Sequence, residues 1–142
     1  MKYFSISELC YSATAKARGI YNEPTAAVAD NLVRLTENIL DPLRQAYGKP
    51  IKVNSGYRSK SLNKAVGGAA TSQHVLGQAS DIVGTPNNHY ENAKLFNLAV
   101  NLNLPFCQLI WEKGDSTGPD WVHISYDRNN IKRQVLYLRI IS

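Results

Sequence analysis

The chain has 142 residues, of which hydrophobic residues make up 44%, so we expect one folded domain, residues 1–142, with a real core, and the composition argues against disorder. A net charge of +5 is typical of a solvated basic surface, and it also fits an anionic partner, either nucleic acid or an acidic cell wall. The two cysteines, Cys10 and Cys107, lie far apart in the sequence, which argues against a disulfide framework.

No apolar run near the beginning of the chain has the length of a signal peptide, and no later run is long enough for a membrane span. We therefore expect synthesis in the cytoplasm without a signal peptide. Any action on a cell wall would then need another route of exit, such as release through a membrane pore.

Two long segments have the periodicity of helices. Over residues 25–47, apolar residues recur at steps of three and four, the pattern of an amphipathic helix that faces a core. Pro42 lies inside this pattern, so we expect a kink or break just before it. Residues 88–101 predict the second long helix, and residues 59–66 predict a short one.

Five further segments predict strands, because they alternate apolar and polar residues or form short apolar runs bounded by turn residues. These segments are residues 50–54, 78–83, 105–112, 121–126 and 134–140. The pattern as a whole predicts an α+β domain. We expect a central antiparallel sheet, with a meander in its C-terminal half, packed by the two long helices.

The stretch from Ser72 to Asp81 contains two side chains of the kind that bind metals. His74 and Asp81 are too far apart for one face of a helix, but Gly77 between them allows the chain to turn and leave as a strand. An imidazole and a carboxylate brought together in this way suit a borderline metal such as zinc, which takes three protein ligands in catalytic sites.

His123 is the best candidate for the third ligand. It lies in the predicted strand 121–126, and it would face His74 and Asp81 if that strand pairs beside residues 78–83. Two histidines and one carboxylate leave a fourth position for water, whose pKa zinc would lower from about 15.7 towards about 7. The remaining histidine, His89, is expected to be a surface or capping residue. The predicted zinc site therefore lies on the sheet.

A hydrolytic site also needs a base for the water and a positive charge for the substrate. Asp120 is the candidate base, although it lies three residues before His123 and a regular strand would turn it to the other face. Arg58 is the candidate cation, stabilising an oxyanion or binding a substrate carboxylate. A surface salt bridge is the structural alternative for Arg58.

These residues occur in an order that resembles a known family. The pattern Ser72-x-His74-x-x-Gly-x-Ala-x-Asp81, followed by Trp-x-His123 and preceded by Ser-Gly-Tyr-Arg58, resembles the M15-type zinc D-Ala-D-Ala carboxypeptidases and peptidoglycan peptidases. The chain looks most like their compact single-domain branch, which includes endolysin-like wall-lytic enzymes. The resemblance covers about residues 40–125.

The resemblance implies a role for each of these residues. His74, Asp81 and His123 would be the zinc ligands, with one zinc ion per chain. Asp120 would be the general base, at a position where many members of the family carry Glu. Arg58 would be an electrophilic arginine, and Ser72 would contact the substrate.

The sequence therefore predicts a zinc metallopeptidase that hydrolyses peptide bonds involving D-amino acids in peptidoglycan stem peptides. It would be a D-Ala-D-Ala carboxypeptidase or a wall-lytic endopeptidase, and we expect a monomer. The alternative is a non-catalytic, zinc-stabilised module that binds the cell wall. Nucleic-acid binding is not expected, because the sequence has no basic stripe interleaved with aromatic residues.

Overall fold

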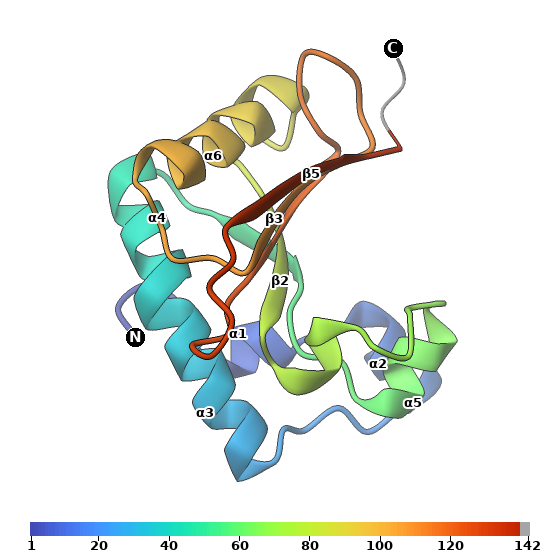
Figure 1. Cartoon of the computed structure of the whole chain (residues 1–142). Helices are drawn as coiled ribbons and strands as arrows, with labels where there is room; N and C mark the ends of the chain where they lie inside the picture. Colours follow the sequence, from blue (N-terminus) through green and yellow to red (C-terminus); the bar gives the residue numbers. More distant parts are fainter. Residues whose placement is uncertain (140–142) are drawn as a thin grey trace.

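A five-stranded sheet forms the centre of the molecule, with the strand order β1-β2-β4-β3-β5 (Figure 1). The structure, a computed structural model, describes residues 1–139. The strands are β1 (Lys52–Ser55), β2 (Ala79–Val83), β3 (Gln108–Glu112), β4 (Trp121–Ser125) and β5 (Gln134–Leu138). The helices are α1 (Ile6–Cys10), α2 (Ala13–Arg18), α3 (Ala26–Leu35), α4 (Asp41–Tyr47), α5 (Lys60–Ala65) and α6 (His89–Asn101), with a π-helical turn η1 (Thr36–Leu40) and a 3-10 turn η2 (Gln73–Leu76). The predicted α+β class is confirmed.

The sheet is mixed, which corrects the expected meander at its last strand. Strands β1, β2, β4 and β3 pair antiparallel, as predicted, but β5 pairs parallel to β3. The connection at residues 126–133 is not a tight turn: it returns the chain to the beginning of β3, where the Gln134 N–H donates to the Cys107 carbonyl. Parallel pairing requires such a crossing connection. The predicted end of this strand, Ile140, lies outside the described residues.

The longest helical stretch is interrupted but not ended at Pro42. Helices α3 and α4 follow each other through η1, in which the Asp41 N–H donates to the Thr36 carbonyl. Because proline has no N–H and its ring clashes with the preceding turn, the chain widens locally into a π-helical turn. The break expected before Pro42 is thus confirmed as this π-helical interruption.

One face of the sheet carries the hydrophobic core. Alternate strand residues pack against α3, α4 and α6, which lie together on one side of the sheet in Figure 1. The sheet residues of this core are Ile82, Leu109, Trp111, Val122 and Ile124. The residues between them, including Asp81 and His123, point to the opposite face, which these three helices do not cover. The candidate zinc ligands Asp81 and His123 therefore lie on the face opposite the core.

Helix α6 is the second long helix that the sequence predicts. Its N-cap is Asn88, whose side chain accepts a hydrogen bond from the Glu91 N–H at 2.8 Å. Among the helices of the described residues, none has the length and apolar character that crossing a membrane requires.

Candidate metal centre

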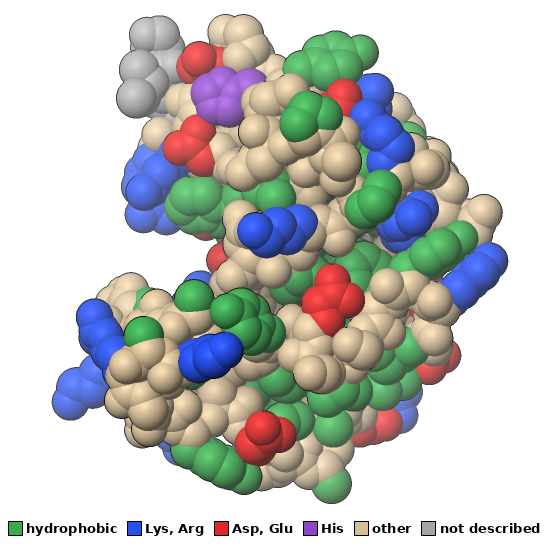
Figure 2. Space-filling view, turned by 180° about the vertical axis from the view of Figure 1, so that it is seen from behind, with side chains coloured by type: hydrophobic (Ala, Val, Ile, Leu, Met, Phe, Trp, Pro, Cys, Tyr) green, Lys and Arg blue, Asp and Glu red, His purple; other side chains and the backbone are tan. Residues whose placement is uncertain are grey.

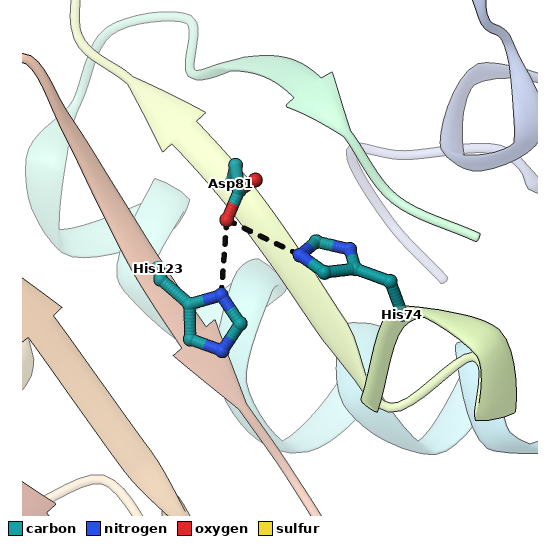
Figure 3. Close-up of side chains that lie close together, drawn as sticks. All are labelled: His74, Asp81 and His123. Atoms are coloured by element: carbon teal, nitrogen blue, oxygen red, sulfur yellow. Dashed lines mark hydrogen bonds and ion pairs between the residues drawn. The ribbon is translucent and has the colours of Figure 1, made fainter. Parts of the chain in front are cut away.

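Three side chains from separate parts of the chain meet on the face of the sheet opposite α3, α4 and α6. His74 comes from η2, Asp81 from β2 and His123 from β4 (Figure 3). One ligand atom from each lies within 4.8 Å of the other two, so the group could hold a metal ion. The structure thus brings together the three residues that the sequence singled out.

The chain reaches this geometry through a short turn followed by a strand. The Ser72 hydroxyl accepts a hydrogen bond from the His74 N–H at 3.2 Å and begins η2. Gly77 ends η2 with a φ of +71°, a left-handed conformation that glycine adopts without strain. Strand β2 then starts at Ala79, as expected. Ser72 therefore has a structural role as a cap, and its contact with a substrate stays a prediction.

Asp81 and His123 are neighbours because of the strand register. They lie directly opposite each other in the antiparallel pair β2–β4, so their side chains share one face. The Oδ1 atom of Asp81 lies 3.0 Å from Nδ1 of His123 and 3.3 Å from Nε2 of His74. Pairing of these two strands was the condition that the sequence set for a site here, and it is met.

The ring of His74 is oriented by a backbone carbonyl. Its Nδ1 lies 2.7 Å from the Gly56 oxygen, which can only accept, so Nδ1 donates to this carbonyl and Nε2 is the nitrogen that faces Asp81. This position requires glycine, because a Cβ atom on residue 56 would lie 2.1 Å from the Leu9 oxygen. Such a partner fixes the orientation of a metal-binding histidine.

The centre is almost buried, since the side chain of His74 is 4% exposed and those of Asp81 and His123 are 13% exposed. Burial by itself raises the pKa of the Asp81 carboxyl, but the hydrogen bonds from His123 and His74 outweigh it and hold that pKa below its usual value. An ionised carboxylate and two imidazole nitrogens form a donor set that fits zinc.

Arg58 also reaches this centre. Its Nη2 lies 3.5 Å from Oδ2 of Asp81, while Nε donates to Ser55 at 3.0 Å and Nη1 to Asn63 at 3.2 Å. The side chain is 17% exposed, so this is not a surface ion pair. Burial lowers the pKa of Arg58 and Asp81 opposes that effect, but a guanidinium stays charged at any physiological pH.

Asp120 contacts a residue outside the group of three ligands. The backbone before it is irregular, as expected: the loop between β3 and β4 contains Lys113 with a left-handed φ of +56°, and at the end of this loop the Asp120 N–H donates to the Glu112 carbonyl. Its Oδ1 atom lies 2.9 Å from Nε2 of His89, at the start of α6. His89 is a surface residue, as predicted, while Asn88 is the cap. The pairing of His89 with Asp120 had no signal in the sequence, because the two are 31 residues apart in different elements.

The molecule is deeply hollowed on one side. Figure 2 shows this hollow between the end of the molecule that carries β5 and the end that carries α5, which Figure 1 places at opposite ends of the sheet. Beside η2, a surface pocket of about 520 Å³ is lined in part by Lys60 and Lys64 of α5. A concave, partly basic surface therefore lies close to the turn that carries His74.

Comparison with known proteins agrees with this site. The sequence model of the family described as Peptidase M15 matches residues 2–125. A zinc D-Ala-D-Ala carboxypeptidase of Streptomyces albus G is 44% identical over 59 residues, which are 41% of this chain and 23% of that relative. The match thus spans about a quarter of the relative's length. Because the family model covers most of the chain, this protein belongs to the peptidase M15 family.

Proposed function

We propose that the protein is a zinc metallopeptidase, with one zinc ion per chain held by His74, Asp81 and His123. The observation that carries this proposal is the meeting of three ligand atoms within 4.8 Å of one another. Its support comes also from the carbonyl that orients His74 and from the family to which the chain belongs. When bound, zinc supplies a Lewis acid that makes a water molecule acidic enough to attack near neutral pH.

Asp120 is the proposed general base, which accepts the proton of the attacking water and later passes it to the leaving amine. Base catalysis of this kind contributes about 10²–10⁴ in rate. The proposal rests on its position in the motif that ends at His123. Asp120 Oδ1 is hydrogen-bonded to His89, so Oδ2 is the oxygen that remains to take the proton.

Arg58 is the proposed electrophile. Its guanidinium is held by three side-chain contacts, to Ser55, Asn63 and Asp81, so its charge is fixed in place before a substrate arrives. A preorganised cation stabilises the negative charge that develops on the carbonyl oxygen during amide hydrolysis. The same fork can bind a carboxylate of the substrate.

The proposed substrate is a peptidoglycan stem peptide, cleaved at a bond that involves a D-amino acid. The relative from Streptomyces albus G is named for the D-Ala-D-Ala bond, which supports a carboxypeptidase; a wall-lytic endopeptidase is the other form of this activity. Such peptides carry free carboxylates, and the net charge of +5 and the pocket beside Lys60 and Lys64 suit an anionic polymer.

Digestion of purified peptidoglycan tests this proposal. The purified protein is analysed for zinc and incubated with wall fragments, and the products are identified by mass spectrometry. We expect about one zinc per chain and the release of new amino groups. Loss of a terminal D-Ala would identify a carboxypeptidase, and a cleaved stem or cross-bridge an endopeptidase. Binding to the wall with no product would contradict the proposal and favour a zinc-stabilised wall-binding module.

A further inference from the structure

A second cluster of titratable side chains joins the first turn of α6 to the loop between β3 and β4. We call this the loop cluster; its members are His89, Asp115, Thr117 and Asp120. Nε2 of His89 lies 2.9 Å from Oδ1 of Asp120. On the other side of the ring, Nδ1 lies 3.3 Å from the Thr117 hydroxyl and 3.4 Å from Oδ1 of Asp115.

The neighbours of the two ring nitrogens of His89 are hydrogen-bond acceptors. The Thr117 hydroxyl donates its hydrogen bond to Asp115, so towards His89 it can only accept. A carboxylate oxygen of Asp120 faces the other ring nitrogen. Both nitrogens of His89 therefore face acceptors, an arrangement that a doubly protonated imidazolium satisfies on both sides and a neutral ring satisfies on one.

The backbone around Asp120 is held against α6 by separate contacts. The side-chain amide of Asn92, on the next turn of α6, donates to the carbonyls of Pro119 and Asp120, each at 3.1 Å. Gly118 packs so closely on α6 that a Cβ atom there would lie 1.8 Å from the His89 oxygen. These contacts fix where the main chain of Asp120 lies, and His89 is left to fix the side chain.

We propose that His89 is a positioning residue for the Asp120 carboxylate. By bonding Oδ1, it limits rotation of the side chain at the residue that leads into β4 and leaves Oδ2 as the oxygen available for proton transfer. This inference rests on the proposed function, in which Asp120 is the base. It goes beyond the motif that contains Asp120, because His89 lies outside that motif, at the start of another element.

The surroundings of His89 carry charges of both signs. Asp115 and Asp120 are its acidic neighbours, and the basic residues Lys113 and Arg139 line the same surface pocket of about 370 Å³. A neutral His89 can still donate from Nε2 to Asp120. The positioning contact therefore needs only one donor on the ring, and the variants below test that contact.

The test compares His89→Ala, His89→Gln and a control, Tyr90→Phe, on the adjacent exposed residue of α6, each in zinc-loaded protein. We expect His89→Ala to lower kcat about ten- to hundredfold with KM changed less than about twofold, because a misplaced catalytic group loses rate rather than binding. His89→Gln, which keeps a donor, should recover part of the loss. Zinc content should be unchanged in all three variants.

A double-mutant cycle separates positioning from a general structural effect. If His89 acts through Asp120, then His89→Ala causes no further loss of kcat in an Asp120→Ala background. Equal losses in both backgrounds, or a loss that appears in KM alone, would overturn the proposal.

A second measurement needs no activity. In zinc-free protein, the ring ¹⁵N shifts of His89 are recorded by NMR, and we expect Asp120→Asn to move them while Tyr90→Phe leaves them in place. Unchanged shifts in Asp120→Asn would overturn the contact itself. If the wild type releases no product from any wall peptide, the proposed function fails and the positioning role with it, while the NMR result still decides whether the contact exists.

Discussion

The metal centre and the loop cluster both combine histidine with aspartate, but they differ in burial and in the direction of their nitrogen atoms. At the metal centre, two imidazoles from different elements present one nitrogen each to the same carboxylate oxygen, and the side chains are 4–13% exposed. In the loop cluster, one imidazole separates two carboxylates, and the side chains of His89 and Asp120 are 36% and 47% exposed. At the metal centre the ligand atoms surround one position, whereas in the loop cluster the His89 ring lies between two carboxylates.

This difference follows from the elements that carry the residues. Asp81 and His123 are opposed in a regular ladder, and His74 is held by a carbonyl, so backbone contacts bring the three ligand atoms together. Asp120 instead follows a loop with left-handed residues at Lys113 and Gly114. Nitrogen and oxygen atoms that converge in an almost buried site can bind a metal ion. The exposed side chains of the loop cluster instead form hydrogen bonds and surface ion pairs with one another.

Removing a proposed zinc ligand should have the largest effect and should distinguish the metal centre from the loop cluster. We expect His123→Ala to lower zinc affinity by more than about 100-fold, because losing a ligand costs more than losing a ligand's hydrogen-bond partner. His89→Ala, which removes an equally polar ring from the loop cluster, should leave zinc affinity unchanged. Competition with a chelator measures both. Equal losses in the two variants would show that the two clusters are not distinct.

Asp120→Ala should separate catalysis from metal binding. We expect kcat to fall by about 10²–10⁴, the contribution of a general base, with zinc content unchanged. Steady-state kinetics on a D-amino-acid peptide and metal analysis of the same sample provide the measurement. Full activity in this variant would exclude Asp120 as the base and leave the loop cluster a structural feature.

Arg58→Ala should lower kcat while leaving the three proposed zinc ligands in place. The expected loss in kcat is about 10²–10³, the cost of removing one group that stabilises an oxyanion. Arg58→Lys keeps the charge but not the three-way fork to Ser55, Asn63 and Asp81, so it should recover little. The same kinetic assay applies, and an Arg58→Lys variant with wild-type kcat would argue for a simple point charge.

Gly56→Ala should weaken the metal centre through the backbone. The new Cβ would meet the Leu9 oxygen at 2.1 Å and displace the carbonyl that orients His74. We expect zinc affinity to fall by about 10–100-fold and stability by about 1–3 kcal/mol. Gly19→Ala is the control for backbone strain alone: a Cβ atom there has open space, but a φ of +64° disfavours alanine, so stability should fall while zinc affinity stays unchanged. Unaltered zinc affinity in Gly56→Ala would mean that the carbonyl does not orient the ring.

The smallest expected effect concerns the ion pair between Lys49, which is half-exposed, and Glu91 of α6. Hydrogen bonds from Lys49 and Tyr47 lower the pKa of Glu91 from 4.5 to about 2. Because the folded state favours the ionised form, this contribution to stability is full above about pH 4.5 and is lost as the pH falls towards 2. We expect the difference in melting temperature between wild type and Glu91→Gln to shrink over that range. A constant difference would contradict the assignment.

The sequence predicted the meeting of His74, Asp81 and His123 because each step is local: a glycine turn, a strand period of two, and pairing of two strands. Pro42 likewise predicted the interruption of the long helix. The roles of Gly56 and His89 could not be predicted, since a carbonyl has no side-chain signal and the His89–Asp120 contact joins elements far apart in the chain. The parallel direction of β5 depends on the path of residues 126–133, which an alternating pattern does not specify.

The central claim is that His74, Asp81 and His123 bind one zinc ion together. Crystals grown with zinc, measured at its absorption edge, test this claim most directly. We expect one strong anomalous peak per chain, within coordination distance of an atom from each of these three side chains. A peak beside His89 and Asp120 instead, or no peak at the three residues at saturating zinc, would contradict it.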